Sequence, residues 1–356
     1  MEIAHDVVSS MLRGRVMLKL VLDMRRFTPC LYGLVCLFCL VASAASAQNR
    51  VLSLDGDGDY VRLPSNLLNG LSEITIEGWV KWERLGYFSQ PFGFGSTEEK
   101  WDVVAINNAQ NLTDLQFFMY VRKRLYLIRV NGILQADRWY HLACVIGFSS
   151  MKLYLNGILI GENSHTGNLP TFDAGQLNAF GKPHWKDNDD FKGQLDEIRV
   201  WKVPRTGEQI RASMFRKLKG DEADLIGLWS FDPNDARDLT PSGYNGVMVG
   251  DARCIEAEIP TPDELPRPMI LSGTITDEEA NPLANVDVRL KRLNGTLFQT
   301  QTDHSGYYRL VIFPKNHPYD LSATWGTKGD WKLGLSLHPG VHRTVNFTLK
   351  QAISIS

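Results

Sequence analysis

The sequence predicts an all-β protein with two β-sandwiches in tandem, and three observations support this fold class. Short apolar runs alternate with polar residues and are broken by Gly, Asn and Asp, the pattern of strands and turns. The pair Asn156-Gly157 lies between two such runs and is typical of a type I′ hairpin. One segment, 207–219, has a clear helical pattern. Strands without interleaved helices form antiparallel sheets that pack face to face.

The first 47 residues are expected to be an upstream extension and a signal peptide. Met24-Arg-Arg supplies positive charge, Leu31 to Ala42 an apolar stretch, and Ala45-Ser46-Ala47 a small-residue cleavage site. We expect translation to start at Met24. The mature protein would then be secreted or extracytoplasmic, at the cell surface or in the periplasm. Left uncleaved, the apolar run from Cys30 to Ala47 would instead anchor the chain in a membrane.

Residues 48–256 are predicted to form the larger sandwich. The segments 74–82 and 139–146 are rich in β-branched and aromatic residues and are expected to be strands. The runs 151–155 and 158–160 flank the hairpin turn. With about 200 residues, this region is long enough to bury a single large core.

The helix of this region has recognisable start and stop signals. Thr206 is the expected N-cap, Gln209 completes a capping box, and Gly220 ends the helix. Its apolar positions, spaced by four, predict a single buried stripe. They are Ile210, Met214 and Leu218.

The segment 190–201 is predicted to be a long strand with an acidic residue among apolar ones. Regular alternation would place Asp196 on the same face as Ile198 and Val200. A carboxylate on an apolar face is costly unless a donor, a cation or a metal satisfies it. This strand is therefore a candidate ion site.

Seven motifs in order resemble those of LamG-like, concanavalin A-like jelly-roll domains. They are the segments 51–61, 74–79, 139–141, 153–157, 191–201, 227–232 and 238–243. The resemblance covers nearly all of 50–256. It implies a sandwich of two antiparallel sheets.

The rest of the chain divides into three parts. Residues 257–268 contain four prolines and are expected to be an extended linker. Residues 269–350 resemble the carboxypeptidase regulatory-like domain, a small transthyretin-like β-sandwich, through 273–277 and 302–308 among other segments. Residues 351–356 look like the start of a further segment, so the chain is either truncated or part of a longer modular protein.

The LamG-like resemblance also implies a structural Ca²⁺ site. Related sandwiches hold the ion between the opening loop and the acidic residue of the later strand. Carried over, this suggests Asp196 together with Asp55 and Asp57. The alternative is that Asp196 accepts hydrogen bonds from backbone amides and the other two residues form Asx turns.

The loop 181–190 is the best ligand candidate in the sequence. It places Trp185 close to Asp187, Asn188 and Asp190. A tryptophan offers a flat apolar face for a sugar or an interface, and the carboxylates and amide can bond hydroxyl groups. In the alternative reading Trp185 packs into the sandwich and the loop is solvated.

Two cysteines follow the predicted signal, Cys144 and Cys254. An exported protein can form a disulfide between them. The alternative is two free thiols, because the sequence does not give the Cα separation that a bridge requires.

Composition and motifs favour binding over catalysis. Net charge is −2 with no basic block, which makes nucleic acid an unsuitable partner. Catalytic signatures are missing, and Glu73 and Glu77 share a strand face but have Thr75 between them where laminarinase-type glucanases have Asp. The sequence therefore predicts a non-catalytic binding module for a glycan or a protein surface. A sensory or spacer front end of a longer protein, or a divergent glycoside hydrolase, are the alternatives.

Overall fold

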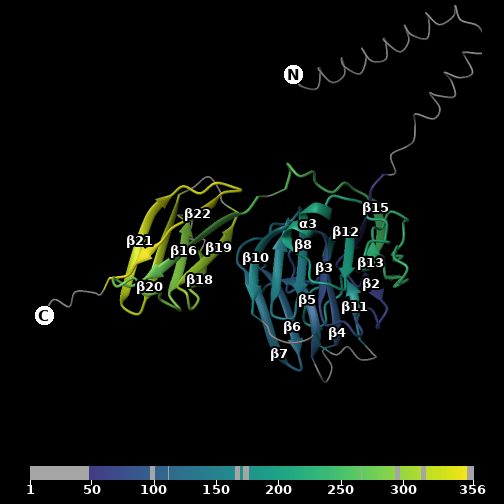
Figure 1. Ribbon diagram of the computed structural model, residues 1–356. Coiled ribbons are helices and arrows are strands. Elements are labelled where there is room, and N and C mark those ends of the chain that lie inside the picture. Colours follow the sequence, from purple (N-terminus) through teal and green to yellow (C-terminus); the bar gives the residue numbers. More distant parts are fainter. Residues whose placement is uncertain are drawn as a thin grey trace, which may run out of the picture. The chain divides into compact units, whose positions relative to one another are not determined.

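The structure is a computed structural model (Figure 1), with elements labelled as in that figure. It describes residues 48–96, 101–110, 112–164, 169–170, 176–265, 267–292, 297–313 and 318–350. The predicted signal peptide at 1–47 and the terminal segment 351–356 lie outside the described residues. No helix within these ranges is long and apolar enough to span a bilayer.

The larger domain consists of two antiparallel sheets, as the alternating sequence pattern predicts. Within the described residues, the first sheet has eight strands. In sheet order these are β10 (Ile158–Asn163), β9 (Met151–Leu155), β8 (Arg138–Ile146), β3 (Ile74–Arg84), β12 (Lys192–Trp201), β1 (Arg50–Asp55) and β15 (Arg253–Glu256), with β13 (Leu225–Trp229) also paired to β12.

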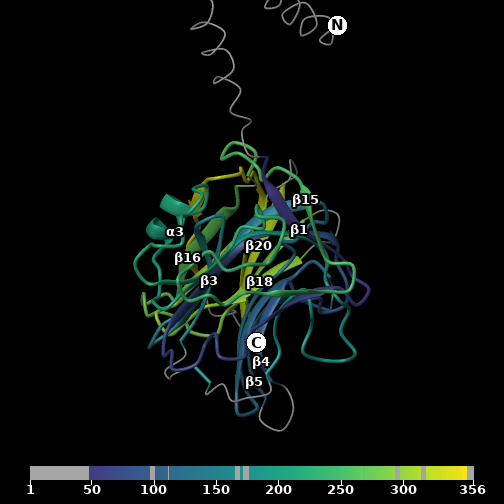
Figure 2. The ribbon, with the colours of Figure 1, turned by 90° about the vertical axis from the view of Figure 1, so that its right-hand side faces the viewer.

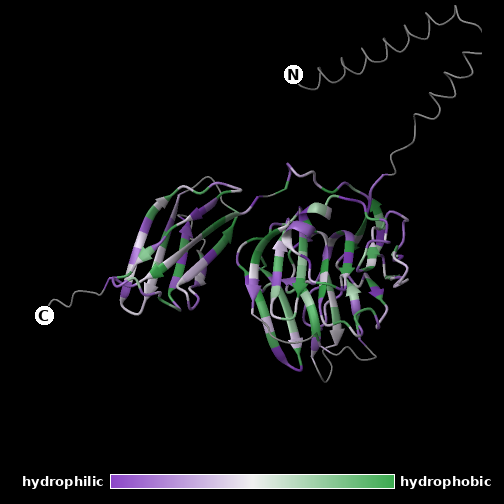
Figure 3. Cartoon of the chain, viewed as in Figure 1, coloured by the Kyte–Doolittle hydropathy of each residue, from purple (hydrophilic) through white to green (hydrophobic). Residues whose placement is uncertain are grey.

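The second sheet of this domain has seven strands in the part of the chain that is described. In sheet order these are β14 (Val247–Val249), β2 (Tyr60–Leu63), β11 (Asn178–Phe180), β4 (Phe92–Ser96), β5 (Asp102–Asn108), β6 (Leu115–Val121) and β7 (Arg124–Val130). The strands closest in sequence, β4 to β7, are joined as neighbours. Large side chains from both sheets, among them Trp82, Phe117 and Trp229, form one buried core. Figure 3 shows the apolar residues concentrated on these strands.

The predicted hairpin is confirmed. Asn156 and Gly157 both have positive φ, at 50° and 73°, between β9 and β10. A type I′ turn requires positive φ at both central residues.

The helix begins as predicted and ends earlier. In α3 (Gly207–Ser213), Thr206 is the N-cap and forms the capping box with Gln209. The prediction of a helix continuing to 219 is wrong, because side chains from the sheet bind the carbonyl groups at its end: Trp79 donates to the carbonyl of Met214 and Arg199 to that of Ser213. Figure 2 shows α3 at the margin of the domain, on the side of β3 rather than of β4 and β5.

The predicted alternation along β12 is interrupted. Glu197 has a positive φ of 49°, and the pairing with β3 shifts between Asp196 and Arg199. This β-bulge inserts one residue, so the side chains after it change faces. Leu195, Ile198 and Val200 enter the core. The prediction that Asp196 shares their face is therefore wrong.

The predicted disulfide is not present, and both cysteines are free. Cys144 lies in the core on β8, and Cys254 lies on β15 at the edge of the same sheet. Three strands separate β8 from β15. At about 4.8 Å per strand the two are roughly 19 Å apart, far beyond the Cα separation of a disulfide.

The second sandwich is smaller and is also built from two sheets. One sheet, in its described residues, contains β19 (Tyr307–Ile312), β16 (Met269–Thr276), β22 (His342–Thr344) and β23 (Phe347–Thr348). The other contains β18 (Leu297–Gln301), β17 (Asp287–Arg292), β20 (Tyr319–Trp325) and β21 (Lys328–Leu335). Its own core includes Val288, Tyr308 and Leu321.

Candidate binding cleft

A cleft of about 350 Å³ lies on the outer face of β5, β6 and β7. We call it the aromatic cleft. Each of its described lining side chains is aromatic, aliphatic or an amide. They are Phe88, Trp101, Asn107, Gln116, Phe118, Tyr120, Leu125, Leu127, Trp185 and Asn188.

The strands present apolar groups on both of their faces, which creates the cleft floor. On β6, Phe117 and Met119 point into the core, and the alternate residues Phe118 and Tyr120 point outward. The outward face of a sheet in contact with water usually carries polar side chains. This stretch departs from that rule, which indicates an outward face that contacts another group.

The aromatic rings contact each other in edge-to-face or tilted arrangements and form the walls. The ring centroid of Trp185 lies 5.9 Å from that of Trp101, 5.9 Å from that of Phe118 and 5.8 Å from that of Tyr120. Trp101 and Tyr120 are 5.3 Å apart with planes at 89°. Such pairs prefer these geometries, so the rings hold each other in place before any ligand arrives.

The loop that carries Trp185 is fixed at both ends. His184 donates a hydrogen bond from Nε2 to the carbonyl of Leu177 at 2.9 Å, and its Nδ1 lies 3.0 Å from the side-chain amide of Gln90. Burial lowers the pKa of His184 to about 4, so its ring is neutral at physiological pH. At the other end, the carboxylate of Asp190 accepts hydrogen bonds from Lys182 Nζ and the backbone of Gly58.

The structure separates the four predicted ligand residues into two groups. Trp185 and Asn188 line the aromatic cleft. Asp190 is engaged in fixing the loop, and Asp187 is exposed outside the cleft lining.

Most of the cleft was not predicted from the sequence. Trp101, Phe118, Tyr120 and Asn107 come from two strands and a loop distant in sequence from Trp185. One signal was available. The run Leu115–Val121 is apolar or aromatic at nearly every position, which is unusual for a strand with one wet face.

The predicted Ca²⁺ ligands do not come together. Asp55 pairs with Lys192, and Asp196 lies four residues further along β12, about 13 Å at ~3.3 Å per residue. Asp196 accepts hydrogen bonds from Asn49 and from the backbone of Glu197, and Asp55 accepts one from the backbone of Asp57. Asp55 and Asp196 therefore lie in two separate sets of hydrogen bonds.

We accordingly expect calcium to have no effect on stability. The carboxylate oxygens named above already accept hydrogen bonds, and Ca²⁺ requires six to eight oxygen ligands. The thermal unfolding midpoint measured in excess CaCl₂ should equal that measured in EDTA. A midpoint that falls in EDTA and recovers with Ca²⁺, but not with Mg²⁺, would contradict this expectation.

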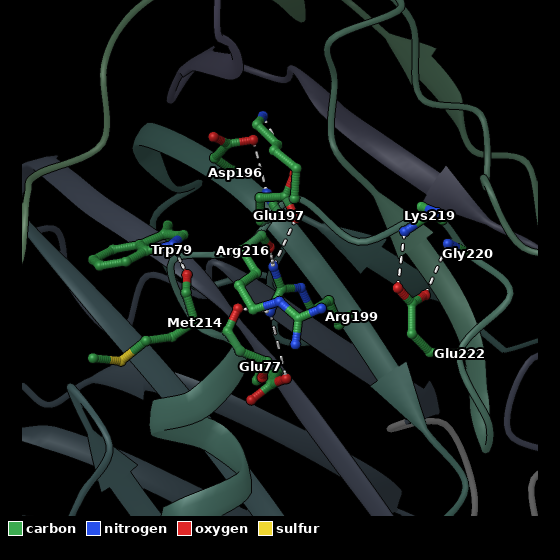
Figure 4. A network of polar contacts seen from close by, with 12 residues as sticks. Glu77, Trp79, Asp196, Glu197, Arg199, Met214, Arg216, Lys219, Gly220 and Glu222 are labelled. Atoms are coloured by element: carbon green, nitrogen blue, oxygen red, sulfur yellow. Dashed lines mark hydrogen bonds and ion pairs between the residues drawn. The ribbon is translucent and has the colours of Figure 1, made fainter.

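A network of buried charges lies on the outer face of the first sheet, beneath α3 (Figure 4). Arg199 is its centre and is fully buried. It donates to the carboxylate of Glu197 at 2.8 Å and to the carbonyls of Ser213 at 3.0 Å and Arg216 at 2.6 Å. It also lies 3.9 Å from Glu77. The network thus attaches the helix end to the sheet.

Asp196 belongs to this network. Burial raises its pKa to about 8, the charge of Glu197 adds to the effect, and Lys217 and the hydrogen bond from Asn49 oppose it. A carboxyl group with this pKa is mostly protonated at neutral pH.

Glu77 is inaccessible to any substrate. It has no exposed surface, and its carboxylate accepts hydrogen bonds from Arg205 at 2.5 Å and Trp201 at 2.9 Å. Burial raises its pKa, and the charges of Arg205 and Arg199 oppose the rise. Glu73 accepts a hydrogen bond from the backbone of Phe148. The pair is thus arranged for structure, not for glycoside hydrolysis, which needs two carboxyl groups flanking a substrate.

Two family models match the chain in the predicted order. Residues 55–211 match the concanavalin A-like lectin/glucanases superfamily, and residues 270–350 match the carboxypeptidase regulatory-like domain. The first domain thus has a lectin-like fold.

Individual proteins are similar at low identity. Mouse pappalysin-1 is 23% identical over 190 residues, which are 49% of this chain and 12% of pappalysin-1. A candidate carbohydrate-binding protein from Bacteroides ovatus is 20% identical over 60% of this chain and 61% of its own, with a TM-score of 0.46. The carbohydrate-binding module of a Ruminococcus gnavus sialidase, solved with α2,3-sialyllactose, is 12% identical over 46% and 97%, with a TM-score of 0.38.

Proposed function

The chain carries a concanavalin A-like domain followed by a carboxypeptidase regulatory-like domain, and on this premise we propose that it is a non-catalytic, extracytoplasmic carbohydrate-binding module. The aromatic cleft is the proposed binding site. The extracytoplasmic location depends on the signal peptide predicted from the sequence.

The aromatic cleft carries the proposal because it combines the two kinds of group that a sugar needs. A pyranose ring has apolar C–H faces, which the rings of Trp185, Trp101 and Tyr120 can cover. It also has hydroxyl groups, which donate and accept hydrogen bonds like the amides of Asn107 and Gln116. Ligand sites in proteins are typically apolar clefts with a few placed polar groups and volumes of about 300–1,000 Å³.

The cleft also argues against hydrolysis. Among the described residues that line it, none is a carboxylic acid. Of the two carboxylates that the sequence offered for catalysis, Glu77 is buried on β3 of the other sheet and Glu73 lies just before that strand. We therefore propose that the cleft binds a sugar and does not cleave it.

Loss of Trp185 should abolish most of the binding. On a glycan array probed with the full mature chain, we expect wild-type protein to bind a subset of glycans. Trp185→Ala should weaken the affinity for these about 10- to 100-fold, because a large aromatic contact is removed. Isothermal titration with the best array ligand measures the change.

Two further variants make this test specific. Leu125 is 45% exposed at the cleft, so Leu125→Asp should weaken binding without disturbing the core. Trp331 is 57% exposed on the second sandwich, so Trp331→Ala should bind like wild type. A blank array, or binding that survives both cleft substitutions, would remove the proposal.

A further inference from the structure

We infer that the aromatic cleft selects neutral saccharides and excludes sialylated, uronic acid-containing and sulfated ones. This inference rests on the proposed function, since it names the class of sugar for the same site. Three features of the cleft support it.

The first feature is the lack of charge in the cleft. None of the described side chains that line it is charged at neutral pH. An anionic sugar would lose water there without gaining a cation, and an unpaired charge taken out of water is strongly unfavourable. A neutral sugar incurs no such penalty.

The second feature is that several charged groups near the cleft are already engaged. Asp189 accepts a hydrogen bond from the backbone of Tyr87 at 2.7 Å, and Lys182 binds Asp190 at 2.8 Å. On β7, Arg129 binds Asp114 at 2.8 Å. His184, next to Trp185, is neutral above about pH 4 because burial lowers its pKa to about 4. None of these groups is set to receive a carboxylate or a sulfate.

The third feature is an unsatisfied hydrogen-bond acceptor. Asn107 is only 3% exposed and lines the cleft, and its Oδ1 atom has no hydrogen-bond partner in the described structure. A buried acceptor without a donor is costly, so a ligand that brings a donor is favoured. A sugar hydroxyl is such a donor, whereas a carboxylate or sulfate oxygen can only accept.

A second amide, that of Gln116, lies beside Asn107 in the cleft. Gln116 lies directly opposite Asn107 in the pairing of β5 with β6. Directly opposed residues have Cβ atoms about 5 Å apart. Two adjacent amides, each with donors and an acceptor, match two neighbouring hydroxyl groups on one ring. The arrangement recognises hydroxyl groups and has no cation for an acid.

The test compares matched glycans that differ only in charge. The probes are lactose with 3′-sialyllactose, together with array pairs of each neutral oligosaccharide and its uronate or sulfated form. We expect the full mature chain to prefer the neutral members by at least 10-fold, with little change between low and high NaCl. Trp185→Ala should weaken this binding about 10- to 100-fold, as proposed above.

A charge-gain variant gives an independent readout. Leu125→Lys places a cation at the edge of the cleft, and Leu125→Gln is its neutral control of similar length. The lysine variant should reduce the preference for neutral members several-fold, and the glutamine variant should not.

The outcomes separate this inference from the proposed function. If acidic glycans bind as tightly as neutral ones, and Trp185→Ala weakens the binding of both, then the cleft binds sugars and the inference is wrong. If no glycan of either class binds, or if binding ignores Trp185→Ala, the proposed function fails and the inference with it.

Discussion

Replacement of Arg199 by alanine should lower the free energy of unfolding of the larger domain by about 3–5 kcal/mol, the cost of breaking a buried ion pair by removing one partner. The side chain is fully buried. Its loss leaves the carbonyls of Ser213 and Arg216 without their donor and removes the closest cation from Glu197. Buried polar groups that lose their hydrogen-bond partner no longer have an interaction that offsets the cost of their desolvation.

Calorimetry of the full chain measures this effect. For a domain of about 200 residues, 1 kcal/mol shifts the midpoint by roughly 2–4 °C, so a decrease on the order of 10 °C is expected in the transition of the larger domain. Arg199→Lys should fall between wild type and alanine, because it keeps the charge and loses the fork of donors. Arg237 pairs with Asp235 on the surface, and Arg237→Ala should leave the midpoint nearly unchanged. Equal shifts for Arg199→Ala and Arg237→Ala would refute the structural role of the network.

Local sequence signals were sufficient to predict the hairpin turn and the start of α3. Asn156-Gly157 needs positive φ at two positions and forms the predicted turn. Thr206 and Gln209 satisfy each other's backbone and begin α3 as predicted. These features depend on residues within four positions of one another, so no tertiary contact is needed to anticipate them.

Features that depend on distant partners were not predictable. The bulge at Glu197 brings Ile198 and Val200 to the face opposite Asp196, and a two-residue periodicity does not predict it. The end of α3 is set by Trp79 and Arg199, which come from two different strands. In both cases the tertiary contact determines the local structure.

The aromatic cleft shows the same limit for the candidate site. The loop 181–190 was singled out because its residues are adjacent in sequence, and Trp185 does line the cleft. Its partners Trp101 and Tyr120 reach it only because β11, β4, β5 and β6 are neighbours in the sheet. The sequence suggested that Asp187 and Asp190 bond ligand hydroxyl groups, but in the folded loop Asp190 accepts hydrogen bonds that fix the loop.

The titration of Asp196 should make the protein less stable as the pH rises from about 4 to about 8. Burial raises the pKa of this carboxyl group to about 8 in the folded state, whereas an unfolded aspartate titrates near ~3.9. Between these values the folded chain holds a proton that the unfolded chain has released. The stabilisation is complete below the unfolded pKa and is lost progressively up to the folded pKa, with a slope of about 1.4 kcal/mol per pH unit.

Comparison with Asp196→Asn isolates this contribution from other titrating groups. Asparagine does not ionise, and its oxygen can still accept the hydrogen bond from the backbone of Glu197. Chemical denaturation at several pH values should therefore show wild type losing stability relative to Asp196→Asn between pH 4 and 8. Asp235 is the control of opposite sign, since hydrogen bonds from Arg237 lower its pKa. Wild type should lose stability relative to Asp235→Asn only as the pH falls below about 4. Parallel pH profiles for wild type and Asp196→Asn would show that Asp196 is ionised in the folded protein, and that Lys217 and Asn49 outweigh its burial.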